Sequence, residues 1–225
     1  MRMLWAAFYS FVHISLLRAA LTFAGNNRRL PACWNDGVAG SPHMKGIVFT
    51  EFFDMVEQQH GLATVERLLE AVRPENAGAY TAVGNYDHME MVGYVGALAR
   101  SADQSMDAIL TGFGEHLFGV FVRRFPDLIR SANSAIEFLA AIESSIHVEV
   151  LKLYPDAELP RFEYALREAD RLSMVYRSRR PLAPFAHGLI RGCIAHFGDP
   201  LDVRMRDLSD GQGTAAQFDI LPVAA

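Results

Sequence analysis

The sequence predicts an α+β fold in which a run of helices precedes a small antiparallel sheet with one inserted helix. Apolar residues recur at helical spacing over most of residues 47–154. Beyond Pro155 and Pro160 this pattern gives way to short alternating segments separated by turn residues. A helical stretch then returns within this second part, so one helix is expected between the strands.

The expected helices fill the first part of the chain. Phe49 and Phe52 lie on one side of the first of them. The last begins near Asn133 or Ser134, because both are good N-cap residues, and runs to about Tyr154. The expected helices cover residues 47–60, 63–73, 86–101, 104–122, 126–131 and 134–154.

The strands are expected in two pairs after the last of these helices. A polar turn around Glu168-Ala169-Asp170 joins the first pair, and a turn-rich segment from Ser209 to Gly213 joins the second. The expected strands cover residues 161–166, 172–180, 202–206 and 216–221, with a helix over residues 182–197 between the two pairs.

Length and composition bound the class of protein. The chain has 225 residues, 51% of them hydrophobic, which suffices for one domain with a sizeable core. A formal net charge of −5 and the lack of a long Lys/Arg block give nucleic-acid binding no electrostatic support. Cys33 and Cys193 are the only cysteines, so a disulfide framework is excluded and a reducing, cytoplasmic setting is expected.

Residues 1–43 differ in composition from the rest and are expected to form an N-terminal extension to a domain of residues 44–225. Residues 3–24 are apolar, but His13 and Arg18 interrupt the roughly 20 apolar residues that a transmembrane helix needs. The charge of Arg18 within this apolar stretch also argues against a signal peptide. A disordered tail, an amphipathic helix and a start codon assigned too far upstream are the alternatives, and no stable membrane insertion is expected.

A single histidine in the last expected helix of the first part is the first candidate for a site. Ile146, Val148 and Val150 surround His147 with apolar side chains, which indicates partial burial. Neutral imidazole is the usual axial ligand of haem iron. A lone histidine among apolar residues is also typical of a core side chain bonded to a backbone carbonyl, so both interpretations stay open.

A polar motif about thirty residues later is the second candidate. In a strand, side chains alternate in direction, so Tyr176, Ser178 and Arg180 would point to one face. Two hydroxyls and one guanidinium would then converge, and charge-assisted bonds from arginine suit carboxylates. The alternative is an amphipathic strand whose polar face is in water.

Other polar clusters are weaker candidates. His187, Cys193 and His196 are close in sequence, but at about 100° per residue they spread around a helix, which argues against a zinc site. The sequence contains no glycine-rich phosphate loop and no nucleophile with a convincing companion base.

From Met44 to about Leu221 the chain resembles the H-NOX (haem nitric oxide/oxygen binding) family, which includes the haem domain of soluble guanylate cyclase. The tyrosine, serine and arginine motif downstream of a single histidine is the haem signature of this family. The matching stretches are residues 44–49, 86–88, 114–118, 147–150, 153–155, 176–180 and 188–192.

The resemblance implies a haem b cofactor and a role for each site residue. His147 would be the axial ligand of the iron, and Tyr176, Ser178 and Arg180 would bind the haem propionates. Pro160 takes the position of a proline that presses on the porphyrin in this family. The resemblance also implies a gas sensor and not an enzyme, whose partner is a separate histidine kinase or diguanylate cyclase.

The expected distal residues are apolar, which bears on the choice of gas. Oxygen-binding members of the family carry a distal tyrosine where this chain has Phe185, and the companion polar positions are Phe52 and Leu117. A hydrogen-bond donor stabilises bound O₂, by about 0.5–1.5 kcal/mol between neutral groups, whereas NO needs little such help. The sequence therefore resembles the branch selective for NO, with CO as a further ligand. The expected pocket residues are Val48, Phe52, Leu117, Phe121, Phe185 and Leu189.

Other functions remain open. One is an oxygen-binding or redox haem sensor, and another is a haem-dependent enzyme such as a peroxidase, which a distal His and Arg would favour. A haem carrier or a non-haem helical partner module is the third. The absorption spectrum of the purified protein would separate them.

Overall fold

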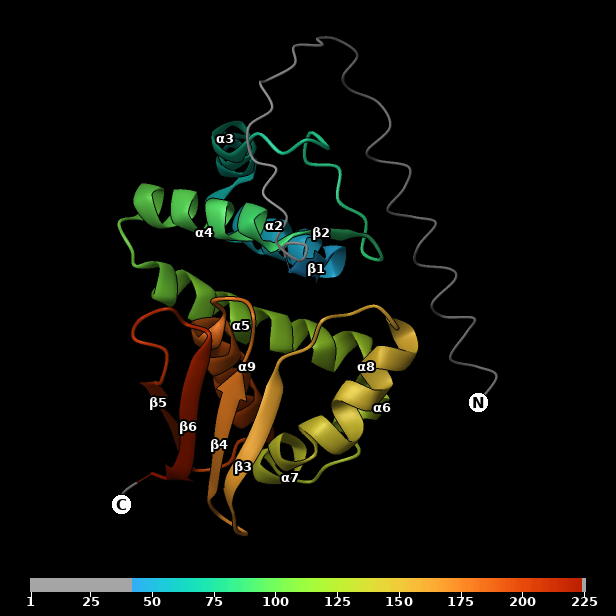
Figure 1. Ribbon diagram of the computed structural model, residues 1–225, viewed down its shortest axis with the longest axis vertical. Helices are drawn as coiled ribbons and strands as arrows, with labels where there is room; N and C mark the ends of the chain where they lie inside the picture. The colour runs from blue at the N-terminus through green and yellow to red at the C-terminus, as the bar shows by residue number, and fades with distance from the viewer. Residues whose placement is uncertain (1–41, 224–225) are drawn as a thin grey trace. The chain divides into compact units, whose positions relative to one another are not determined.

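The computed structural model describes residues 42–223, with most helices in the first part and the larger sheet in the second (Figure 1). The elements are β1 (His43–Lys45), α2 (Gly46–His60), α3 (Leu62–Val72), β2 (Asn85–Asp87), α4 (His88–Ala102), α5 (Met106–Arg124), α6 (Pro126–Ile129), α7 (Ala135–Ala140), the π-helix η1 (Ile142–Ile146), α8 (His147–Leu153), β3 (Arg161–Arg167), β4 (Leu172–Arg177), α9 (Ala183–Phe197), β5 (Leu201–Asp207) and β6 (Ala215–Pro222).

The larger sheet is antiparallel throughout, and its strands lie in the order β3, β4, β6, β5. α9 connects β4 to β5 and packs on this sheet, so it is the inserted helix that the sequence predicts. A separate ribbon of β1 and β2 pairs Met44 with Tyr86 next to the helical part. The predicted α+β class is confirmed.

The core consists of two apolar clusters, with α5 and α9 contributing to both. The first lies among α2, α4 and α5 and contains Phe52, Phe113 and Leu117. The second lies between the larger sheet, α7 and α9 and contains Phe118. Leu189 on α9 packs against both clusters. Burial of each large apolar side chain contributes about 1.5–3 kcal/mol, so the two clusters stabilise the fold jointly through these two helices.

α5 and α9 cross with their backbones almost in contact. A Cβ atom at Gly114 would lie 2.3 Å from the backbone oxygen of Phe185, and one at Gly188 would lie 2.0 Å from that of Thr111. Real side chains do not approach so closely, so only glycine fits at these two positions. The crossing fixes the spacing between the side chains that α5 and α9 present to the core.

One predicted helix is wrong as a continuous element. The sequence predicts a single helix from residue 134 to residue 154, but the chain forms α7, η1 and α8 in succession. Ser134 caps α7 as predicted, because its hydroxyl accepts a bond of 3.2 Å from the N–H of Glu137. Further on, the N–H groups of Ile146 and His147 bond to carbonyls five residues earlier, which defines a π turn. A wider turn shifts the side chains that follow it around the helix axis, and the pattern of residue types alone did not indicate where this turn lies.

Two further differences concern strands. The strand predicted over residues 172–180 ends at Arg177, because the hydroxyl of Ser178 accepts a bond of 3.0 Å from the N–H of Arg180 and starts a local turn. β1 and β2 are absent from the prediction, since three residues are too few to show an alternating pattern.

The extension predicted over residues 1–43 lies outside the described residues, apart from Pro42 and His43. These two contact the rest of the domain: Nδ1 of His88 lies 2.9 Å from the carbonyl oxygen of Pro42, and His43 begins β1. Within residues 42–223 no helix is long and apolar enough to cross a membrane.

Candidate functional site

The predicted iron ligand, His147, is the first residue of α8 and follows directly on the π turn. Its side chain is 15% exposed, and Nδ1 lies 3.3 Å from Oε1 of Glu143 on η1. Burial lowers the pKa of His147, while the charge and hydrogen bond of Glu143 act in the opposite direction. Because burial has the largest effect, the imidazole is neutral at pH 7 and can serve as a ligand.

Two residues beside His147 are absent from the sequence prediction. The ring of Phe162 on β3 lies 6.0 Å from the imidazole, centre to centre, and its backbone N–H donates a bond of 2.7 Å to Oε1 of Glu143. The spacing of Glu143 and His147, four residues apart on a helix, is a signal that could have identified Glu143. No sequence signal connects Phe162 to this site, because β3 arrives from a different part of the chain.

Tyr176 is the fifth residue of β4, and Ser178 follows directly on the end of this strand. Tyr176 is 2% exposed, and its ring packs between Phe162 on β3 and Phe218 on β6. Burial raises the pKa of Tyr176, while a hydrogen bond with Ser178 and the charge of Arg180 oppose this shift. The side chains of the motif therefore lie near one another, although the strand itself ends before Ser178.

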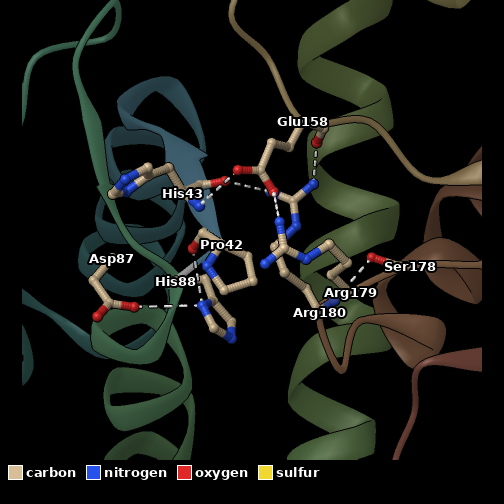
Figure 2. A network of polar contacts seen from close by, with 8 residues as sticks. All are labelled: Pro42, His43, Asp87, His88, Glu158, Ser178, Arg179 and Arg180. Carbon is tan, nitrogen blue, oxygen red and sulfur yellow. Dashed lines mark hydrogen bonds and ion pairs between the residues drawn. The ribbon is translucent and has the colours of Figure 1, made fainter. Parts of the chain in front are cut away.

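Arg180 is a buried cation whose acceptors are backbone carbonyls. Its guanidinium donates 2.9 Å to the carbonyl oxygen of His43 on β1 and also donates to that of Glu158 (Figure 2). The side chain is 8% exposed, and burial lowers its pKa. Among the described residues no carboxylate forms a direct ion pair with Arg180, although the nearby charge of Glu158 opposes the effect of burial on its pKa.

The segment that contains Pro160 connects α8 to β3 and is bonded to the β1–β2 ribbon. Lys45 Nζ lies 2.6 Å from Oδ1 of Asp156, and Nδ2 of Asn85 donates 2.5 Å to Oδ2 of the same carboxylate. These bonds lower the pKa of Asp156 to about 2. Pro160 itself is half-buried at the end of this segment, directly before β3.

The predicted distal residues come together in the first core cluster. Phe52 and Leu117 are fully buried members of it, and the remaining four pack against it while partly buried. These four are Val48, Phe121, Phe185 and Leu189. His147 and the Tyr176 motif lie instead beside the second cluster, through Phe162 and Tyr176. Leu189 is the predicted pocket residue that reaches both clusters.

Phe113 packs with the predicted distal residues but is absent from the prediction. Its ring lies 5.2 Å from that of Phe52 and 5.1 Å from that of Phe185, so it bridges α2 and α9. Phe113, Leu117 and Phe121 follow one another at four-residue spacing along α5, and this helical period could have identified it. We call the apolar side chains of Phe52, Phe113, Leu117, Phe121 and Phe185 the distal wall, and none of them carries a hydrogen-bond donor.

The residues present fit a haem group. Haem needs an uncharged nitrogen ligand for iron, cations for its carboxylates and apolar surface for its ring. His147 offers the uncharged nitrogen ligand. The buried guanidinium of Arg180, which has no direct ion pair, offers the cation. The side chains around Phe52, Phe113 and Phe185 offer the apolar surface. Within residues 42–223 no group of three or more His, Cys, Asp or Glu side chains is placed to hold a metal ion.

Comparisons with known proteins agree with this chemistry. A model of the haem-NO-binding family matches residues 45–205. The structure of an Fe(II) unliganded H-NOX protein from K. algicida is similar, with 37% identity, 81% of this chain and 98% of that chain covered, and a TM-score of 0.77. The IWP-051-bound H-NOX from Shewanella woodyi in the Fe(II)CO state has 33% identity, covers 80% of this chain and 95% of that chain, and has a TM-score of 0.68.

A third similar structure is an H-NOX protein from S. oneidensis in the Fe(II)NO state. It has 26% identity, covers 80% of this chain and all (100%) of that chain, and has a TM-score of 0.74. No curated protein matches the chain.

Proposed function

Because the chain belongs to the haem-NO-binding family of haem-based gas sensors, we propose that it holds haem b, senses nitric oxide at ferrous iron and signals to a separate protein. The observation that carries the proposal is a contrast between two sets of residues. One set presents a neutral imidazole and a buried guanidinium, and the other presents only apolar side chains.

Each residue of the first set has a part in holding the cofactor. Haem, when bound, supplies an iron at which a diatomic gas can coordinate. His147 is the proposed iron ligand, and Tyr176, Ser178 and Arg180 are the proposed propionate ligands. Arg180 has the largest effect among these three, because a hydrogen bond to a charged group contributes about 1.5–3 kcal/mol. Pro160 is proposed to press on the porphyrin from the segment before β3.

The second set accounts for the proposed preference among gases. An O₂ ligand at such an iron would be stabilised by a hydrogen-bond donor from the protein, whereas an NO ligand would need little such help. Phe52, Leu117 and Phe185 offer no donor, and Phe113 between them offers none either. The distal wall therefore disfavours O₂ relative to NO and CO. One missing hydrogen bond between neutral groups corresponds to roughly 0.5–1.5 kcal/mol of binding free energy, and several missing bonds correspond to more.

The same helix that carries His147 also offers a surface for the partner. Val148, Leu151 and Leu153 on α8 are 45%, 41% and 50% exposed. A change in the bond that His147 makes would move this helix, so its surface would differ between the gas-free and gas-bound states. We propose a histidine kinase or a diguanylate cyclase as the protein that reads this difference. The composition, with two cysteines, supports a cytoplasmic setting.

A set of absorption spectra tests the proposal. The purified protein is loaded with haem b, reduced, and exposed in parallel to NO, CO and air. We expect spectra of NO and CO complexes and no persistent O₂ complex. A persistent oxygenated spectrum would instead identify the protein as an oxygen sensor, and rapid turnover of peroxide would identify it as an enzyme. Failure to bind haem would reject the NO sensor, the oxygen sensor and the haem-dependent enzyme alike.

A further inference from the structure

A carboxylate one helical turn before His147 is held in place from two sides. Oε1 of Glu143 accepts the backbone N–H of Phe162 at 2.7 Å and lies 3.3 Å from Nδ1 of His147. The first contact comes from β3 and the second from α8, so this one oxygen joins the strand, the π turn and the histidine helix. A freely rotating surface glutamate would have no such fixed position.

The imidazole is in turn held by its neighbours. His147 is 15% exposed, and the ring of Phe162 lies 6.0 Å away at an interplanar angle of 41°. Phe162 therefore fixes both the carboxylate, through its backbone, and one side of the imidazole, through its ring. Rotation of His147 about its side-chain bonds would break the contact with Glu143.

The contact decides which nitrogen of His147 is free. A histidine that binds a metal is neutral and carries one N–H. At 3.3 Å from Oε1 of Glu143, Nδ1 is the nitrogen placed to carry this proton, which would leave the lone pair on Nε2. Outer-shell carboxylates in this position fix the tautomer and raise the basicity of a histidine ligand.

We propose that Glu143 is a positioning residue for His147: it accepts the Nδ1–H, presents Nε2 to the iron and strengthens the iron–histidine bond. This inference rests on the proposed function, in which His147 holds the haem iron. It adds that the strength of that bond, and hence the fraction of His147 that stays bound in the NO complex, is set by the negative charge at residue 143.

Two variants separate this role from a purely structural one. Glu143→Gln keeps a side-chain oxygen that can accept the N–H of Phe162 but removes the negative charge. Glu149→Gln is the matched control, because Glu149 lies on the same helix two residues from His147 and pairs instead with Lys152 at 2.5 Å. A structural tether predicts little change for Glu143→Gln beyond stability, whereas a positioning role predicts a change at the iron.

The first measurement uses the haem-free protein, so it does not depend on the proposed function. In ¹⁵N NMR spectra of the imidazole, His147 should carry its proton on Nδ1 in the unaltered protein. Glu143→Leu, which removes the acceptor, should shift the population toward the Nε2–H tautomer, and Glu149→Gln should not. An Nε2–H tautomer in the unaltered protein would overturn the proposal.

The second measurement uses the haem-loaded ferrous protein. Resonance Raman spectra of Glu143→Gln should show a lower iron–histidine stretching frequency. In the NO complex, the ratio of histidine-free to histidine-bound iron should rise by about 10-fold, the lower end of the range for outer-shell partners. An unchanged frequency and ratio in Glu143→Gln would overturn the positioning role even if haem binding is normal, and a protein that takes up no haem would overturn the proposed function while the NMR result stands.

Discussion

The two groups of residues at the proposed haem site are built by different means. The distal wall consists of apolar side chains from α2, α5 and α9 that pack into one cluster. The group around His147 and Arg180 depends on polar contacts with backbone atoms of distant segments, such as the N–H of Phe162 and the carbonyl oxygen of His43. Packing tolerates changes that conserve volume, but a polar contact fails when one partner moves. Substitutions in the polar group should therefore cost more.

The largest effect is expected for the proposed iron ligand. His147→Gly removes the imidazole and leaves space that free imidazole can occupy. Haem affinity should fall by more than about 100-fold, beyond the range for outer-shell partners. Haem content measured by absorbance should recover when imidazole is added. A normal histidine-ligated spectrum without added imidazole would show that another residue holds the iron.

The next largest effect is expected for the buried cation. Arg180→Ala leaves the proposed propionate without its charged partner, so haem transfer to a scavenger protein should quicken by about 10-fold or more, equivalent to about 1.5–3 kcal/mol. Arg179→Ala is the matched control, because this neighbouring side chain is 62% exposed. Equal transfer rates in the two variants would contradict the assignment of Arg180.

Shortening the chain at the start of the domain should have an effect of intermediate size. A chain that begins at Pro42 keeps the bonds from Pro42 to His88 and from His43 to Arg180, whereas one that begins at Met44 loses them. At about 0.5–1.5 kcal/mol for the neutral bond and about 1.5–3 kcal/mol for the bond donated by the charged guanidinium, the shorter chain should be less stable by about 2–4.5 kcal/mol. Urea denaturation of the two chains measures the difference. Equal stability would show that these contacts contribute nothing, and haem loss in both would mean that the preceding residues are needed.

A donor placed in the distal wall should have a smaller effect. Phe185→Tyr puts a hydroxyl among apolar side chains and should tighten O₂ binding by roughly 2- to 12-fold, the equivalent of about 0.5–1.5 kcal/mol. Phe118→Tyr serves as the control, because Phe118 lies on α5 but in the second cluster, against Phe138. Flash photolysis under oxygen measures both variants. A gain in Phe118→Tyr alone would mean that the wall has been assigned to the wrong cluster.

The smallest effect is expected at the exposed carboxylate of Asp156. Hydrogen bonds from Lys45 and Asn85 lower its pKa from the ordinary 3.8 to about 2. Since folding lowers this pKa, the stabilisation is fully present above pH 3.8 and is lost as the pH falls toward 2. Asp156→Asn should therefore lower the Tm slightly near neutral pH, and the gap from the unaltered protein should close in acid. A gap that is constant between pH 6 and pH 3 would contradict this account.

The distal wall was more accessible to sequence reasoning than the polar group. The family resemblance brought Phe52, Leu117 and Phe185 into one set, and in the structure they belong to or pack against one cluster. The resemblance to the family and the α+β class are confirmed. Phe113 was missed although its spacing on α5 follows the helical period.

What sequence reasoning could not provide is mostly non-local. The contact of Glu143 with Phe162 joins residues 19 apart, and that of Arg180 with His43 joins residues 137 apart. Both use backbone atoms, which leave no signature in residue identity. The π turn before His147 left no signal in the sequence either, because Ile142 and Ile146 both pack against the second cluster, as side chains four residues apart on a regular helix would. The roles of His147 and of the Tyr176 motif stay predictions until haem binding is measured.

The way Arg180 is anchored has a consequence for how related sequences can diverge. Its acceptors are the main-chain oxygens of His43 and Glu158, and every amino acid supplies such an oxygen. As far as these two bonds are concerned, positions 43 and 158 can change in residue type while the arginine keeps its place, provided that the backbone path is preserved. Among homologues, we expect an unchanging arginine facing two variable positions, a pattern in which covariation would not reveal that these residues touch.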